Sequence, residues 1–149
     1  MPERPTSGIG SDPFLAFNFL IEIDGLTVGG FAEVTGLQVE VEVEDYREGG
    51  VNGFVHKLRG AVRYPSNLVL KRGLVGGDQL LAWQEQTLQG KLEMRNLSVV
   101  LCDGKNQEAQ RWNFAKAYPV RWSGPELRAG TSAVAIETLE FVHQGMMEV

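Results

Sequence analysis

Apolar and polar residues alternate most regularly between Leu37 and Tyr46, in the segment L-Q-V-E-V-E-V-E-D-Y. Side chains of a strand point to its two faces in turn. One face therefore carries Leu37 and three valines, and the other carries Gln38 followed by Glu40, Glu42 and Glu44. We expect the apolar face to pack on a core. The acidic face should meet water or an aqueous cavity, because like charges this close along one strand repel each other.

Further apolar or alternating runs, separated by glycine-containing turns, predict additional strands. These are expected at 14–23, 26–34, 54–58, 67–71, 92–102, 111–122 and 133–143. Asp24-Gly25 favours a tight turn between the first two strands. The phase of the last run breaks near Glu137 and Thr138. That break indicates a β-bulge, a strand that changes partner or a strand that passes between subunits.

One helix is predicted between Asp78, which suits an N-cap, and Gly90, which suits a C-terminal stop. Its apolar face is expected to carry Leu81 and Leu88, with Leu80, Trp83 and Thr87 beside them. The polar side is expected to carry Gln84, Glu85, Gln86 and Gln89. These elements predict a mainly β fold, a small antiparallel β-barrel or sandwich with one flanking α-helix. The domain should span residues 14–149. Residues 1–13, rich in Pro, Ser and Gly, are expected to form a flexible N-terminal arm.

The composition suits one globular domain, with 149 residues of which 43% are hydrophobic and 22% charged. The formal net charge of −5 argues against nucleic-acid binding, which usually requires a basic surface. Cys102 is the only cysteine, so the chain forms no internal disulfide. This fits assembly inside a cell. Residues 1–10 lack the apolar centre of a signal peptide, and no apolar run is long enough to span a bilayer.

No pattern of catalytic residues is evident. His56 and His143 belong to no zinc-binding motif, and Cys102 follows an apolar run in which nothing nearby would lower the pKa of its thiol. The glycine clusters lack the order of a phosphate-binding loop. The three tryptophans have basic neighbours, but scattered tryptophans are more often core or interface anchors than stacking platforms for nucleic acid. We therefore expect no enzyme, cofactor or metal site, and a structural or binding role.

Five segments then occur in a characteristic order. They are D-P-F-L-A-F-N-F-L-I-E-I-D-G-L (12–26), G-G-F-A-E-V-T-G-L (29–37), E-D-Y-R-E-G-G-V-N (44–52), N-L-V-L-K-R-G-L (67–74) and R-W-N-F-A-K-A-Y-P-V-R-W-S-G-P-E-L (111–127). In this order the chain resembles the inner-tube proteins of contractile phage tails and of extracellular contractile injection systems. The resemblance runs from Asp12 to about Gly145. One departure is R-G-A-V at 59–62, where such proteins often carry a Pro-Gly turn.

The resemblance implies an Hcp-like tail-tube fold and a structural role. Such proteins form hexameric rings that stack into a hollow tube, which a contracting sheath drives through a target envelope. Expected partners are further copies of the chain, the sheath protein, baseplate or tube-initiator proteins, tube-terminating proteins and cargo in the lumen, with no membrane insertion by this subunit. Assembly is expected in the bacterial cytoplasm, as part of a phage tail or of a released extracellular particle.

Within this frame Glu40, Glu42 and Glu44 are candidates to face the lumen. An equally open alternative is that they pair with Arg or Lys of a neighbouring subunit. The candidates for stacking one ring on the next come from the glycine-rich loop and the N-terminal segment. They are Tyr46, Arg47, Glu48, Asn52, Phe54, Asp12 and Phe14.

Three other functions remain to be compared with the repeated tube subunit. A tube-initiator or baseplate-proximal paralogue would resemble it closely. A ligand-binding β-barrel of lipocalin type would need an apolar interior with an open mouth. A β-rich enzyme would need a catalytic constellation that the sequence does not display.

Overall fold

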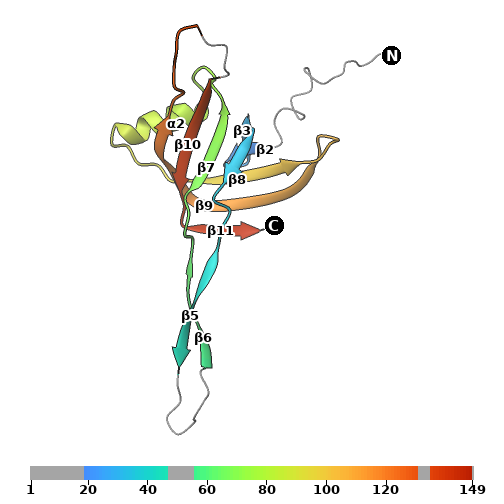
Figure 1. Ribbon diagram of the computed structural model, residues 1–149, viewed down its shortest axis with the longest axis vertical. Coiled ribbons are helices and arrows are strands. Elements are labelled where there is room, and N and C mark those ends of the chain that lie inside the picture. The colour runs from blue at the N-terminus through green and yellow to red at the C-terminus, as the bar shows by residue number, and fades with distance from the viewer. Residues whose placement is uncertain (1–18, 47–55, 131–134, 149) are drawn as a thin grey trace.

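The computed structural model describes residues 19–46, 56–130 and 135–148, and these are mainly β with one helix (Figure 1). The elements are β2 (Phe19–Ile23), β3 (Leu26–Phe31), β4 (Glu33–Thr35), β5 (Glu40–Tyr46), β6 (His56–Arg63), β7 (Leu68–Gly73), α2 (Gln79–Leu88), β8 (Arg95–Cys102), β9 (Glu108–Ser123), β10 (Ile136–Val142) and β11 (Gly145–Glu148). The predicted fold class, mainly β with a flanking helix, is confirmed.

The principal sheet is antiparallel and curls around the core. Its strand order is β3-β2-β8-β9-β10-β7-β4, with β11 on β9. The two ends of this order belong to one segment, because β3 runs into β4 through Ala32. The Ala32 N–H donates to the Lys71 carbonyl oxygen at 3.0 Å. The strands β5 and β6 form a separate two-stranded hairpin that projects from the body (Figure 1).

The longest strand, β9, is shared by two parts of the sheet. Its first part pairs with β8 and β11, and its second part, from Tyr118 to Ser123, pairs with β10. Just before this change of partner, Lys116 adopts φ +52°, which is uncommon for a residue other than glycine, at the register shift of the β8–β9 pairing where β9 bends. The partner change considered for the last strand therefore occurs in β9.

The core lies inside the curl and under the helix. Its largest fully buried side chains include Trp83, Phe31, Phe114, Phe141, Leu70 and Leu97. The rings of Trp83 and Phe141 have centroids 5.5 Å apart, and the Trp83 indole N–H donates to the Glu93 carbonyl oxygen at 2.8 Å. Burial of each such side chain contributes about 1.5–3 kcal/mol. Trp83 thereby fixes helix α2 on the sheet.

The ends of the helix are as predicted, and its buried face is so in part. The Asp78 carboxylate accepts from the Leu81 N–H at 3.0 Å, and Gly90 follows the helix with φ +89°. The buried helical residues are Leu80, Trp83 and Gln84, and Leu81 is partly buried against the core, whereas Leu88 is 75% exposed. The prediction is therefore wrong for Leu88, expected on the apolar face, and for Gln84, expected on the polar side. The packing of Trp83 against Phe141 determines which face of the helix is buried against the sheet.

The expected bulge at Glu137 and Thr138 is also wrong. Glu137 is fully buried, in phase with Leu139 and Phe141, and the register shift lies between Glu140 and Phe141. The apparent break in the pattern arises because a carboxylate occupies a core position, where it is paired with an arginine described below.

Several strand bounds differ from the predicted ranges. The strand expected at 54–58 extends to Arg63, so the 59–62 segment is strand and not a turn. The strand expected at 92–102 begins at Arg95, and β11 was not predicted. The Val/Glu strand, expected from Leu37, begins at Glu40. Gly36 before it has φ +95°, and a Cβ atom there would lie 2.0 Å from the Asn67 carbonyl oxygen. Residues 14–18 lie outside the described ranges.

Replacing Leu80 by alanine should destabilise the fold by about 2–5 kcal/mol, because a buried leucine leaves a cavity. Leu88→Ala on the same helix is the matched control and should change the free energy of unfolding by about 0.5 kcal/mol or less. Urea denaturation followed by tryptophan fluorescence measures both. Equal losses in the two variants would contradict the observed helix orientation.

Candidate functional site

The β5–β6 hairpin carries an apolar strip that no other part of the described chain covers. Val41 lies opposite Val62, and Val43 shares their face two residues further along β5. All three side chains are between 40% and 60% exposed, as is Val39 just before the strand. The predicted alternation is present, and Leu37 packs against the core as expected, but the expectation that the valines of this face do so is wrong. The strip (Val41, Val43 and Val62) is free to contact another molecule.

The opposite face of the hairpin carries the predicted row of glutamates. Arg63, the last residue of β6, lies 3.2 Å from the Glu42 carboxylate and 3.9 Å from that of Glu40. Glu44 lies opposite Leu58, and no cation among the described residues pairs with it. A basic residue of the same chain therefore compensates part of the acidic row, and all of these side chains are exposed.

The register of the hairpin changes where Glu42 passes over Gly60. A Cβ atom on Gly60 would lie 3.0 Å from both the Glu42 Cβ and the Glu42 carbonyl oxygen. The R-G-A-V segment thus supplies an irregular strand in place of a Pro-Gly turn. Only glycine allows the two backbones to approach this closely.

Most of the residues proposed for ring stacking lie outside the described ranges. Tyr46 ends β5 opposite His56. Arg47, Glu48, Asn52 and Phe54 of the glycine-rich loop, and Asp12 and Phe14 of the N-terminal segment, are among the residues that the structure does not describe. Their role stays a prediction.

A polar groove separates the root of the hairpin from the body. It has a volume of about 490 Å³ and is lined by Thr35, Gln38, Ser66, Asn67 and Glu140 among others. Ser66 donates to the Gln38 side chain at 2.7 Å, and the Asn67 amide donates to Glu140 at 2.6 Å. These contacts tie both ends of the hairpin to the polar face of β7 and β10.

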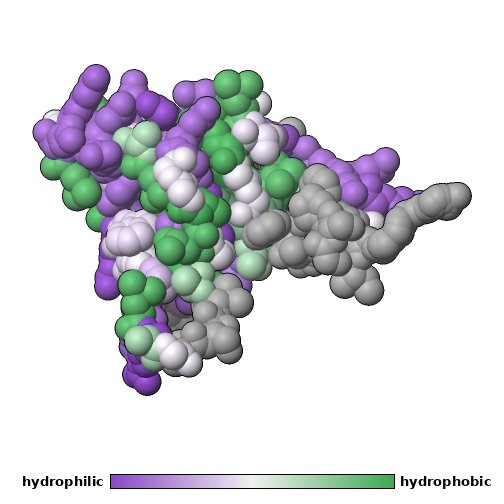
Figure 2. Space-filling model, turned by 90° about the horizontal axis from the view of Figure 1, so that it is seen from above, coloured by the Kyte–Doolittle hydropathy of each residue, from purple (hydrophilic) through white to green (hydrophobic). Residues whose placement is uncertain are grey.

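A second exposed apolar surface lies at the end of the molecule opposite the hairpin. Leu74, Val75, Trp122 and Ile136 are each between 42% and 49% exposed, and we call them the end patch. The Leu74 N–H donates to the Ala135 carbonyl oxygen at 2.9 Å, which holds the segment after β7 beside the start of β10. Figure 2 views this end and shows apolar residues gathered near its middle.

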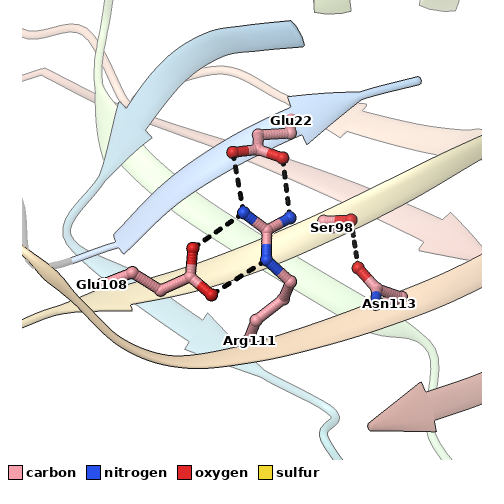
Figure 3. A network of polar contacts seen from close by, with 5 residues as sticks. All are labelled: Glu22, Ser98, Glu108, Arg111 and Asn113. Carbon is pink, nitrogen blue, oxygen red and sulfur yellow. Dashed lines mark hydrogen bonds and ion pairs between the residues drawn. The ribbon is translucent and has the colours of Figure 1, made fainter. Parts of the chain in front are cut away.

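On the outer face of β2, β8 and β9 an arginine is held between two carboxylates (Figure 3). Arg111 donates to both oxygens of Glu22, at 2.7 and 3.1 Å, and to both oxygens of Glu108, at 3.0 and 2.8 Å. These bonds raise the pKa of Arg111 and lower that of Glu108. Ser98 beside them donates to Asn113 at 2.5 Å. Arg111 therefore pairs with carboxylates of its own chain. Its position next to Trp112 is explained by these pairs and does not require a nucleic-acid ligand.

The sequence analysis missed a buried charge network beneath the end patch. Arg72 and Glu137 are 3% and 0% exposed, and the Arg72 Nε donates to Glu137 at 2.7 Å. Arg72 also lies 2.6 Å from Asp78, and Trp122 donates to the other Glu137 oxygen at 2.8 Å. The signal was present in the alternation: Arg72 follows Leu68 and Leu70 at the core positions of β7, as Glu137 precedes Leu139 and Phe141 in β10.

The residues tested for catalysis are dispersed. Cys102 is buried, and burial together with Asp103 and Glu108 raises the pKa of its thiol, as a core role requires. In the part of the chain that the structure describes, no three His, Cys, Asp or Glu side chains gather closely enough to hold a metal ion. Within the same ranges, the helix is neither long nor apolar enough to cross a membrane.

An antiparallel curled sheet with one helix and an uncovered hairpin defines a β-rich subunit with surfaces for self-association. The sequence profile described as T4-like virus tail tube protein gp19 matches residues 15–147, almost the whole chain. The chain therefore belongs to the T4-like virus tail tube protein family and is a structural tube subunit. No curated protein sequence is significantly similar to it.

Solved structures share the fold. A chain in the cryo-EM structure of the anti-feeding prophage baseplate is 28% identical, with a TM-score of 0.75 over 89% of this chain and 93% of that chain. A chain in the sheath-tube complex of an extracellular contractile injection system is 20% identical, with a TM-score of 0.74 over 99% of both chains. A type six secretion system protein is 17% identical, with a TM-score of 0.56 over 89% of this chain and 83% of that chain.

The buried pair yields a test. Arg72→Met should destabilise the fold by about 3–5 kcal/mol, because it leaves the Glu137 carboxylate buried without its cation. The double variant Arg72→Met/Glu137→Met should recover most of this loss, since the fully buried carboxylate is removed and Asp78, which also loses its cation, is partly exposed. The free energy of unfolding in urea, measured near neutral pH, distinguishes them. A double variant as unstable as the single one would show that the pair does not act as a unit.

Proposed function

We propose that this chain is the repeated subunit of an inner tube in which six copies close a ring and the rings stack within a contractile sheath. Membership of the tail tube family supports this proposal. So does the 28% identical chain, which comes from a baseplate described as six-fold symmetrised. The role is mechanical: a rigid hollow tube is pushed outward when the sheath shortens. No step of it requires catalysis by this subunit.

The apolar strip of the hairpin carries the proposal. An isolated two-stranded hairpin is marginally stable in water, and this one exposes Val41, Val43 and Val62 on one face. Burial of a valine contributes about 1.5 kcal/mol or more. A second copy of the chain that covers the strip would therefore stabilise both the hairpin and the assembly.

The positions of the two apolar surfaces favour head-to-tail contact. The strip lies on the projecting hairpin, and the end patch lies at the opposite end of the long axis (Figure 1). Contact between different surfaces of identical subunits is heterologous and, where the rotation does not close, propagates without limit. This is the geometry that a stack of rings needs.

We assign the polar face of the hairpin to the lumen. Glu40, Glu42 and Glu44 lie on the face opposite the strip, and Arg63 compensates two of them only in part. Repeated around a ring, such a face would repel DNA and acidic cargo and limit adhesion. The alternative, pairing of Glu44 or its neighbours with Arg or Lys of an adjacent subunit, predicts a role in assembly instead.

The proposed partners follow from the same role. They are the sheath protein around the tube, the baseplate or initiator proteins at one end and the terminating cap at the other. The similar folds found in baseplate, sheath-tube and cap structures support this assignment. Cargo would occupy the lumen, and assembly would take place in the bacterial cytoplasm.

One observation favours a second candidate, the first ring at the baseplate. The 28% identical chain belongs to a baseplate structure, whereas the chain from a sheath-tube complex is 20% identical. The purified chain decides between the two by electron microscopy. Tubes that grow from this chain alone identify the repeated subunit. Rings that never stack, with a single ring of six copies in each particle, identify the first ring.

Val43→Ser should weaken association without unfolding the subunit, because Val43 is exposed in the single chain. The protein concentration needed for tubes should rise about tenfold, the equivalent of losing one buried valine per contact. Glu44→Ser, the same change on the opposite face, is the matched control and should assemble as the unaltered chain does. Sedimentation and negative-stain microscopy measure assembly. Equal effects of the two variants would argue against the strip as the contact.

Replacing Glu40, Glu42 and Glu44 together by glutamine should leave tube formation intact and increase retention of acidic cargo, because the like-charge repulsion is removed. Retention is measured as the amount of a labelled acidic oligomer that co-sediments with tubes, with a basic oligomer as the control. Loss of tubes in this variant would instead support pairing with a neighbouring subunit.

A further inference from the structure

His143 lies at the root of the hairpin, in the short connection between β10 and β11. Its imidazole is packed against two aromatic rings. The centroid distance is 5.0 Å to Tyr64, in an edge arrangement, and 4.7 Å to Phe114. Phe114 is a buried core residue of β9. Tyr64 directly follows β6, so its ring belongs to the base of the hairpin.

This contact lies where the hairpin leaves the body. Beyond Tyr64, toward the tip, β5 and β6 pair only with each other. The Tyr64 hydroxyl oxygen also lies close to Gly145, the first residue of β11, since a Cβ atom built there would be 3.9 Å away. Packing of Tyr64 against His143 and the start of β11 therefore holds one side of the hairpin root, in addition to the Asn67–Glu140 contact of the polar groove.

The surroundings of His143 suit a neutral ring and not a cation. Its Nδ1 atom is buried and has no hydrogen-bond partner among the described residues. Burial lowers the pKa of His143, although a backbone hydrogen bond with Gly145 opposes this in part. His143 is partly buried, and protonation would place an N–H at this buried Nδ1 atom, where no acceptor among the described residues meets it. The weak attraction of a cation to aromatic rings does not replace the lost water.

The charged groups on the neighbouring elements do not compensate. Tyr64 and Phe114 present aromatic rings to the imidazole. On β9 the nearest charged residue in sequence is Lys116, which is exposed. On β10 it is Glu140, which accepts a hydrogen bond from Asn67 in the polar groove. No described carboxylate faces the imidazole.

We propose that His143 is a positioning residue for the hairpin, and that uptake of a proton by its imidazole expels the ring from between Tyr64 and Phe114, freeing the hairpin and dissociating the assembly in acid. The effect on assembly rests on the proposed function, whereas the movement of the ring is a property of the single chain.

The direction of the pH dependence follows from linkage. Because the folded chain binds the proton less readily than the unfolded chain, the packing contributes fully above the ordinary histidine pKa of about 6.5. It is lost as the pH falls below that value and through the lowered pKa of the folded state.

The test uses the full chain and takes advantage of its two histidines. Assembled wild type, His143→Phe and His56→Gln are brought from about pH 7.5 to about pH 5 and back, a range in which only histidine ordinarily titrates. We expect wild type and His56→Gln to lose more than about half of their sedimenting tubes at the lower pH, because protonation of His143 disrupts its packing. Both should regain the tubes when the pH is raised again. His143→Phe, which keeps a ring between the two aromatic residues, should stay assembled throughout. Acid resistance of the wild type, or equal acid loss in His143→Phe, would overturn the proposal.

A second measurement separates this inference from the proposed function. In unassembled wild-type chain, proton NMR follows titration of His143 and the cross-peaks between its ring and those of Tyr64 and Phe114. The cross-peaks should disappear as His143 titrates. Cross-peaks that persist through the titration would overturn the role of His143, whether or not copies associate. If they disappear but no tubes form at any pH, the role of His143 stands and the tube function fails.

Discussion

The buried ion pair between Arg72 and Glu137 constrains much of the architecture. The two residues lie directly opposite each other in the pairing of β7 with β10. A slip of one residue would turn Glu137 to the solvent face and leave Arg72 buried without its carboxylate. Arg72 also contacts Asp78 at the start of α2, and its guanidinium lies 4.7 Å from the centre of the Phe31 ring in β3. The Arg72 guanidinium thus links the register of β7 and β10 to the position of helix α2 on the sheet.

Local rules accounted for those features that local chemistry determines. The caps at Asp78 and Gly90 and the turn at Asp24-Gly25 follow from side-chain and backbone preferences within a few residues. The helix face does not, because the choice between Leu80 and Leu88 depends on where Trp83 meets Phe141, a residue nearly sixty positions away in sequence. The phase break near Glu137 misled for a related reason: a charged residue at a core position is interpretable only once its distant partner is known.

The hairpin shows a different limit of sequence reasoning. Alternation correctly predicted one apolar and one acidic face between Glu40 and Tyr46, but it cannot say whether the apolar face is buried within the chain or against another. For Val41 and Val43 it is not buried within the chain. On the acidic face the compensating Arg63 lies about twenty residues further on, across a pairing whose register depends on Gly60. The sequence therefore predicts the acidic face of the strand, but the partial charge compensation on that face is visible only in the folded hairpin.

The bend at Lys116 limits how the length of this chain can vary. Because β9 pairs with β8 up to Ala117 and with β10 from Tyr118 onward, an inserted or deleted residue in either part would reverse the inward and outward positions of that part. Neighbouring copies that depend on those faces would be affected at the same time. Insertions and deletions among relatives should therefore occur in connections such as the Asp103–Gln107 turn. The number of residues in β9 should stay constant, because it sets the positions of the faces that neighbouring copies contact.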